Sequence, residues 1–194
     1  MNGVEKMISG VDGFVGKHVL MDCQSSNIFK LCSIEYLYNF ITSLTEKLGM
    51  TLVIPPVIVQ FPFSGEADTL VKKLIDSGIK SSILDEFLFH LKKKQKQEAG
   101  ISGIAIWAES HTSFHSWPDD MFFSLDIYSC KDFEPIIAMK YVYDYFNLTY
   151  FSYSIIDRYI NSKHKICTGE VTDDFSSINY PCQSRTDTLY SNKQ

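Results

Sequence analysis

Three strand-like segments follow one another between residues 101 and 128, and no segment of helical length separates them. Residues 101–108 are almost continuously apolar, residues 109–118 mix polar and aromatic side chains, and residues 121–128 are again rich in strand formers. Successive strands joined by short connections pair antiparallel, whereas parallel strands need a long crossover. We therefore expect an α+β fold with a largely antiparallel sheet rather than a doubly wound fold.

Helices are expected where apolar residues recur at spacings of three and four. One such stretch begins after Ser33, a plausible N-cap, and ends before Gly49. A second is capped by Asp132 and runs to about Phe146. A helical hairpin is expected over residues 66–97, and the lysines at its end are interpreted as a solvated face.

Further strands are expected on both sides of these helices. Residues 16–23 and 149–156 are rich in strand formers. Residues 51–63 are β-branched and aromatic but contain three prolines, which favours an edge or interrupted strand. The sheet is therefore built from segments that lie far apart in the sequence.

Composition and charge narrow the class of protein. With 194 residues, 45% of them hydrophobic, the chain is long enough for one domain with a buried core. We expect that domain over residues 1–162 and a polar C-terminal tail over residues 163–194. The formal net charge of −5 makes nucleic acid an unlikely partner. No stretch approaches the roughly 20 apolar residues of a membrane span, so no membrane association is expected.

Cysteine usage bears on the compartment. The number of cysteines is odd, their spacings are irregular, and the first fifteen residues lack the apolar run of an export signal. These features favour a reducing, cytoplasmic setting. The cysteines are Cys23, Cys32, Cys130, Cys167 and Cys182.

Chemistry-bearing residues are densest between residues 109 and 120. His111 and His115 have the spacing of zinc ligands on a helix, but a third ligand is missing and the composition favours a strand. A hydrolase nucleophile, Ser110 or Ser113, is a second interpretation, although no nucleophile-elbow motif surrounds either serine. A third is a polar hairpin whose side chains satisfy one another. In a strand, His111, Ser113 and His115 share one face.

Four short motifs follow one another in this part of the chain. They are Ser102-Gly103, Ala108-Glu109-Ser110-His111, His115-Ser116-Trp117-Pro118 and Asp126-Ile127-Tyr128-Ser129-Cys130. In this order they resemble the bacterial-type S-adenosylmethionine decarboxylase proenzymes. The match is strongest over residues 100–134, and residues 16–23, the following helix and Gly49-Met50 support it more loosely.

The resemblance implies self-cleavage between Glu109 and Ser110 into a β chain, residues 1–109, and an α chain, residues 110–194. Ser110 would become a pyruvoyl group, the electron sink that decarboxylation of an amino acid requires, through a Schiff base with the substrate amine. By the same resemblance His115 and Ser102 assist processing, and Cys130 is the acid that reprotonates the substrate carbon.

The resemblance also implies a fold, a substrate and an assembly. The fold is a two-layer sandwich with helices on one face, and the assembly is a homodimer of processed chain pairs with sheet against sheet. The reaction is decarboxylation of S-adenosylmethionine, which provides the aminopropyl donor for spermidine biosynthesis. Asp119 stands where the family usually has a ribose-binding glutamate, residues 66–97 are an insertion, and Phe61 and Phe63 are candidates for stacking on adenine.

Two rival functions remain open from the sequence. One is a pyruvoyl-dependent decarboxylase of arginine or ornithine on the same scaffold, which the shorter Asp119 and the insertion leave open. The other is an unprocessed homologue that acts as a regulatory or binding subunit. The presence of Ser110, His115 and Cys130 together argues against the second.

Overall fold

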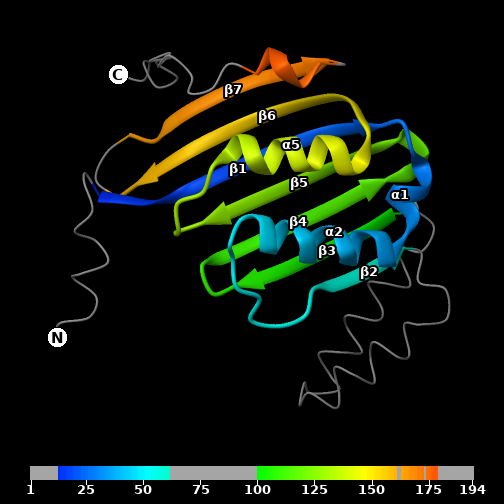
Figure 1. The fold of residues 1–194 in the computed structure, drawn as a ribbon, viewed down its shortest axis with the longest axis horizontal. Helices are drawn as coiled ribbons and strands as arrows, with labels where there is room; N and C mark the ends of the chain where they lie inside the picture. Colours follow the sequence, from blue (N-terminus) through cyan, green and yellow to red (C-terminus); the bar gives the residue numbers. More distant parts are fainter. Residues whose placement is uncertain (1–12, 62–99, 161–162, 173, 179–194) are drawn as a thin grey trace, which may run out of the picture.

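A single antiparallel sheet dominates the protein (Figure 1). The structure, a computed structural model, describes residues 13–61, 100–160, 163–172 and 174–178. Within these residues seven strands pair in the order β2-β3-β4-β5-β1-β6-β7, each antiparallel to its neighbours. The strands are β1 (Phe14–Ser25), β2 (Val57–Phe61), β3 (Gly100–Trp107), β4 (Ser110–Trp117), β5 (Phe122–Ser129), β6 (Leu148–Tyr159) and β7 (Lys165–Thr172).

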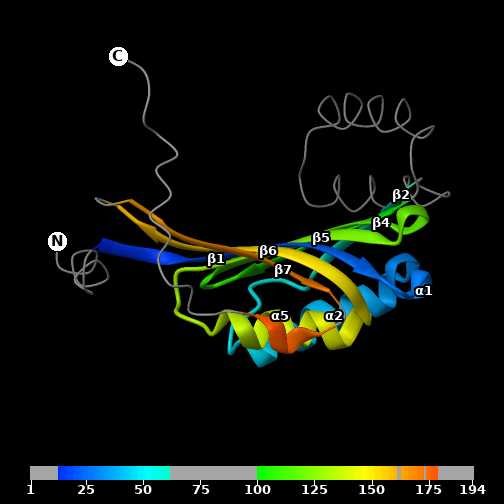
Figure 2. The same ribbon diagram turned by 90° about the horizontal axis from the view of Figure 1, so that it is seen from above.

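The α-helices of the described residues all lie on one face of this sheet (Figure 2). The hydrophobic core lies between the two layers, and Phe40, Phe123 and Phe146 are fully buried there. The expected two-layer α+β sandwich with a mainly antiparallel sheet is therefore confirmed. The helices are α1 (Ile28–Cys32), α2 (Ile34–Lys47) and α5 (Pro135–Phe146), and two short 3-10 turns are η2 (Pro118–Asp120) and η3 (Phe175–Ser177).

Helix α2 begins and ends where the sequence predicts. The Ser33 side chain accepts a hydrogen bond from the Tyr36 amide at 3.2 Å, which satisfies a donor of the first turn. Gly49 follows the helix with a φ of +63°, a left-handed conformation that glycine adopts at little cost. The predicted cap and terminator are both confirmed.

Helix α5 ends at Phe146 as predicted, but its N-cap is Glu134 rather than Asp132. The Glu134 side chain accepts from the Ile136 amide, and Pro135 occupies the first turn. Asp132 instead accepts a hydrogen bond from Lys17 Nζ at 3.0 Å. Asp132, the predicted N-cap, is thus paired with Lys17, a residue distant in the sequence, and does not cap the helix.

The two faces of the sheet differ in character. Residues of β3 and β4 alternate between buried side chains that face the helices and half-exposed or exposed ones that face away. The predicted grouping of His111, Ser113 and His115 on one face is confirmed, and it is the face turned away from the helices. We call this the open face, because no α-helix of the described residues covers it.

Among the described residues, strand β2 lies at an edge of the sheet and pairs with β3 alone, as predicted for residues 51–63. The prolines of that segment, at positions 55, 56 and 62, flank the strand. The chain just before it also runs beside β3, because Val53 N donates to Ile106 O and Ala108 N donates to Thr51 O. The predicted hairpin over residues 66–97 lies outside the described residues. Phe63 also lies outside them, and the Phe61 side chain is not described.

Strand β7 forms the opposite edge of the sheet. This segment is therefore not the loosely held tail that the sequence predicts from residue 163. It pairs with β6 along its whole length, with Cys167 and Val171 buried against the helical layer. The strand is polar in composition because its other side chains face solvent. Residues 179–194 of the expected tail lie outside the described residues. In the described part of the chain, no helix is long and apolar enough to cross a membrane.

Candidate active site

The predicted scissile bond lies at the tip of the hairpin that joins β3 to β4. Trp107 pairs with Ser110, so Ala108 and Glu109 form the two-residue turn between the strands. Ser110 has a φ of +154°, which a residue with a Cβ rarely adopts. Such a conformation costs of the order of 1–3 kcal/mol and persists only where the surroundings enforce it. The turn therefore stores strain at the bond that the sequence predicts to break.

Cys130 contacts the carbonyl oxygen of Glu109 through two donors. Its backbone N–H donates to that oxygen at 3.0 Å and its Sγ at 3.1 Å. Cys130 directly follows β5, whose last residue, Ser129, pairs with Ser110. Paired donors on one carbonyl oxygen stabilise negative charge that develops there when the carbonyl carbon is attacked. The structure thus brings Glu109, Ser110 and Cys130 together, as the sequence predicts.

The Glu109 side chain is held by a residue that the sequence did not single out. Thr51 donates its N–H to Oε2 at 2.9 Å and its hydroxyl to Oε1 at 3.2 Å. The backbone hydrogen bond from Thr51 is the main reason that the pKa of the Glu109 carboxyl is lowered from its ordinary value. The nearest sequence signal is the adjoining Gly49-Met50 pair, which matches the family but does not identify a ligand of Glu109.

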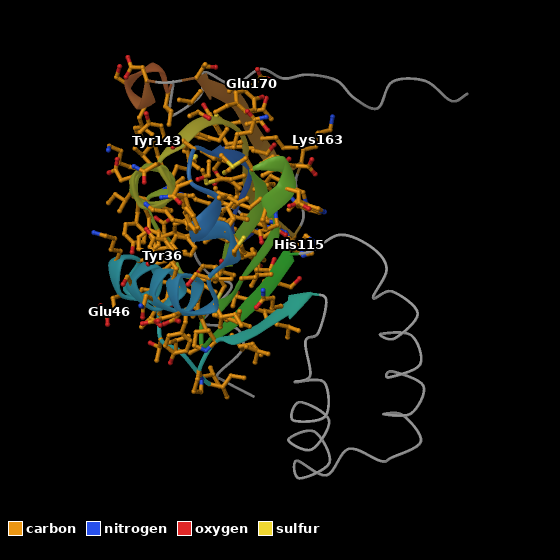
Figure 3. The ribbon with its side chains drawn as sticks, turned by 90° about the vertical axis from the view of Figure 1, so that its right-hand side faces the viewer. Tyr36, Glu46, His115, Tyr143, Lys163 and Glu170 are labelled. Carbon is orange, nitrogen blue, oxygen red and sulfur yellow. The ribbon has the colours of Figure 1, made fainter. Side chains whose placement is uncertain are left out.

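Ser102 and His115 form a pair of their own on the open face. They lie opposite each other on β3 and β4, and Ser102 Oγ lies 2.6 Å from His115 Nδ1. The His115 ring packs edge-on against Trp117, with centroids 4.2 Å apart. Figure 3 shows His115 on the side of the sheet opposite Tyr36 and the helices.

Within one chain, the Ser102–His115 pair lies too far from Ser110 to contact it. His115 lies five residue steps along β4 from Ser110, a distance of roughly 16 Å at the rise of a strand. Asp119 is farther still, exposed in η2 beyond the other end of β4. The predicted site is therefore divided between the two ends of one strand.

An open cavity of about 370 Å³ adjoins the pair on the open face. Ser102, His115, Ser124 and Asp126 are among the residues that line it, and Ser110 is not. The cavity has hydroxyl, imidazole and carboxylate groups on its walls. It can hold a polar molecule or a side chain of another protein, but it does not contain the predicted scissile bond of its own chain.

The alternative interpretations of this segment fit the geometry less well. His111 and His115 lie on a strand, so they are roughly 13 Å apart and cannot share a metal ion. Among the described residues, no group of three or more His, Cys, Asp or Glu could hold one. The serine that contacts a histidine is Ser102, whereas Ser113 Oγ donates to Asp126 at 3.4 Å. Neither serine proposed as a hydrolase nucleophile therefore has the histidine base that this interpretation requires.

The cysteines fall into two groups. Cys130 is an exposed free thiol, and Cys23 and Cys32 are also free. Cys167 in β7 is disulfide-bonded, which differs from the reduced state expected for the cysteines. The thiol at the candidate site is therefore available as a proton donor.

Comparison with known proteins identifies the family of the chain. The S-adenosylmethionine decarboxylase family model matches residues 66–159. The S-adenosylmethionine decarboxylase proenzyme of Thermococcus gammatolerans is 39% identical over 137 residues, which cover 64% of this chain and 90% of that protein. The chain belongs to the S-adenosylmethionine decarboxylase family. The proenzyme of Bacillus velezensis is 34% identical over 100 residues, 51% of this chain and 76% of the relative.

The fold of this family member also has a solved counterpart. The crystal structure of the adenosylmethionine decarboxylase from Aquifex aeolicus aligns with a TM-score of 0.51, at 19% identity, over 77% of this chain and 95% of that one. At this identity the likeness supports the sandwich fold alone. Membership of the family rests on the sequence matches.

Proposed function

We propose that this chain is a self-processing decarboxylase of S-adenosylmethionine, cleaved between Glu109 and Ser110. The single observation that carries the site assignment is the strained Ser110 next to a Glu109 carbonyl that accepts two hydrogen bonds from Cys130. The curated relatives are named as proenzymes, so a chain that must be processed is typical of the family. Residues of this chain therefore supply both the bond that breaks and the donors that favour its breaking.

The bonds that form and break in the proposed cleavage belong to Glu109, Ser110 and water. The Ser110 hydroxyl oxygen attacks the Glu109 carbonyl carbon, the peptide C–N bond breaks, and an ester forms with a free amine on Ser110. Loss of the Ser110 Hα as a proton then breaks the ester Cβ–O bond and releases Glu109 as a carboxylate. The dehydroalanine left behind takes up water and loses ammonia, giving a pyruvoyl group. The Cys130 donors stabilise the oxyanion of the first step.

The residues around Ser110 fit the pyruvoyl group that the family uses. That group supplies the electron sink for loss of carbon dioxide from an amino acid. The Cys130 thiol lies against the Glu109 carbonyl at the same turn, within reach of the position that Ser110 occupies. A thiol is largely protonated near neutral pH because its reference pKa is about 8.5. Cys130 is accordingly proposed as the acid that protonates the product carbon.

Ser102 and His115 are proposed to act on Ser110 of a second copy of this chain. A base must come within about 3 Å of the proton it removes, whereas His115 lies roughly 16 Å from Ser110 of its own chain. The open face can pack against the same face of a second copy. A two-fold axis between the two sheets then makes each copy supply His115 to the other copy's Ser110. A homodimer is the assembly that completes the site.

Asp119 is proposed to bind the ribose hydroxyls of the substrate from the second copy as well. It is exposed in η2, at the same end of β4 as His115. A carboxylate accepts hydrogen bonds from two neighbouring hydroxyls, although aspartate reaches about one methylene less far than glutamate. The relatives described above carry the S-adenosylmethionine decarboxylase name, which does not favour arginine or ornithine as the substrate.

Intact-mass analysis of the denatured protein tests the cleavage. We expect two chains, residues 1–109 and 110–194, and the second should lack a free amine. A single chain of 22.2 kDa would overturn self-cleavage and favour the binding-subunit alternative. Ser110→Ala should stay uncleaved, whereas Ser113→Ala, a change on the same strand, should be cleaved normally.

Release of labelled carbon dioxide tests the substrate. Carboxyl-labelled S-adenosylmethionine should release label, and arginine and ornithine should not. Activity confined to one of the two nucleoside-free amino acids would contradict the proposed substrate while leaving the self-cleavage intact.

A further inference from the structure

Thr51 makes three hydrogen bonds with the turn that carries the scissile bond. Its N–H and hydroxyl donate to the Glu109 carboxylate at 2.9 and 3.2 Å, and its carbonyl accepts from the Ala108 N–H at 2.9 Å. The bond that breaks on processing joins the Glu109 carbonyl carbon to the Ser110 nitrogen. None of the three hydrogen bonds involves an atom of that bond, so all three are retained after cleavage.

Cleavage changes the chemical nature of the Glu109 carbonyl. The carboxylate released at the new chain end consists of the former carbonyl oxygen and the oxygen that came from Ser110. The former carbonyl oxygen already accepts from Cys130 N–H at 3.0 Å and from Cys130 Sγ at 3.1 Å. Once this oxygen carries part of a negative charge, both hydrogen bonds become charge-assisted and stronger.

After cleavage, the new chain end at Glu109 would lose its contact with Cys130 unless a second set of contacts held it in place. Cleavage frees Glu109 on one side, and terminal residues lose order unless they are tied down. On the other side, Thr51 holds both the Ala108 backbone and the Glu109 side chain. Lys131, next to Cys130, donates through Nζ to Gly49 O, which ties the segment before Thr51 to the end of β5. The Thr51 segment and Cys130 are thus fixed to each other on either side of the turn.

We propose that Thr51 is a positioning residue that holds the chain end produced by self-cleavage, so that the new Glu109 carboxylate stays hydrogen-bonded to Cys130. The inference rests on the proposed function, because it needs the cleavage to occur. Before cleavage Thr51 holds the Glu109 carbonyl against the Cys130 donors. After cleavage it keeps the carboxylate as the acceptor that orients the Cys130 Sγ–H at the active centre.

Thr51→Val tests the inference, because it removes the hydroxyl donor and keeps the shape and the backbone N–H. We expect conversion to two chains to slow about fivefold, the effect of losing one solvent-exposed hydrogen bond of typical net strength. In the fully processed enzyme kcat should fall by a similar factor with KM nearly unchanged. Thr51→Ser keeps the hydroxyl and should restore both rates. The control is Thr42→Val, because Thr42 is a half-buried threonine whose hydroxyl donates to Tyr38 O within α2.

Carboxypeptidase digestion of the processed protein reports on the chain end directly. Intact mass should show that glutamate is removed from the β chain about five times faster in Thr51→Val than in the wild type or in Thr42→Val. Equal removal together with unchanged processing and kcat would overturn the inference alone. If the wild type stays uncleaved, the proposed function itself fails, and the inference fails with it.

Discussion

The two ends of β4 differ in which parts of the candidate active site they contain. At Ser110 a strained backbone, the donors of Cys130 and the support of Thr51 converge on one peptide bond. At His115 an imidazole and the Ser102 hydroxyl are paired with each other beside an open cavity. The first end holds a bond to be broken without a nearby base, and the second holds a base without a bond to act on.

This difference is the basis for the proposed dimer, in which the unit of function is larger than one chain. Side chains on one strand that lie five residues apart cannot meet, whatever their rotamers, because the strand is extended. In the proposed dimer, two open faces pack together and the ends of β4 meet across the interface. Variants that affect one end only therefore test how the two ends cooperate.

The largest expected effect is complementation between two inactive chains. His115→Ala should abolish processing because it removes the base, and Ser110→Ala should abolish it because it removes the nucleophile. Co-expressed with different tags, the two should form mixed dimers in which only the His115→Ala chain is cleaved, served by His115 of its partner. Mass analysis of each tagged chain checks this. Cleavage of neither chain would show that His115 does not act across the interface.

The next largest effect is expected at the Ser110 end. Cys130→Ala should lower kcat by about a hundredfold, the lower range for loss of a general acid. Processing should slow less, because the backbone N–H of residue 130 still donates to the Glu109 carbonyl. Rates of labelled carbon dioxide release and of chain cleavage separate the two. Cys32→Ala, another exposed free cysteine, is the control and should change neither rate. Normal turnover by the Cys130 variant would refute its proposed role.

A smaller effect is expected on the stability of the His115 end. Ser116 is fully buried, donates to Leu31 O and accepts from Ile101 N, both at 3.0 Å. Ser116→Ala leaves these buried groups unpaired and should reduce the free energy of unfolding by about 1–3 kcal/mol. Urea unfolding measures the loss, with the half-buried Ser113→Ala as the control. A loss no larger than that of the control would mean that Ser116 does not tie β4 to α1.

The smallest effect is a pH dependence of the open face. Burial lowers the pKa of His18 from its ordinary value, Arg158 and His111 act in the same direction, and Asp126 opposes them. The unfolded chain therefore takes up a proton at higher pH than the folded one. This contribution to stability is fully present above about pH 6.5 and is lost as the pH falls toward the folded pKa. His18→Phe should flatten the decline measured by urea unfolding, whereas His164→Gln should not.

Local patterns in the sequence predict much of the fold. Ser33 and Gly49 bound α2 because a cap and a terminator act on neighbouring residues. The alternation of side chains along β4 is likewise a property of neighbouring residues, and it places His111, Ser113 and His115 on one face. Asp132 and Glu134 are both suitable caps for α5, and Pro135 at the first helical position favours Glu134. The contact of Asp132 with Lys17, which is distant in sequence, cannot be derived from a local pattern.

The candidate site, like the fold, is predicted from the sequence only in part. The family motifs identify Glu109, Ser110 and Cys130, which the fold brings together. They do not indicate that Thr51 holds the Glu109 side chain, because its contribution is one hydroxyl and two backbone groups. Nor do they indicate that His115 is remote from Ser110, since spacing along a chain becomes a distance only when the secondary structure is known.

The pairing of Phe61 with Gly100 has a consequence for how this protein tolerates change. These residues are direct partners in β2 and β3, so the described parts of the two strands end at paired positions. The register on both strands is fixed by the residues before Phe61 and after Gly100. A change in the number of residues between them would therefore leave this pairing, and the geometry around Ser110 at the far end of β3, in place.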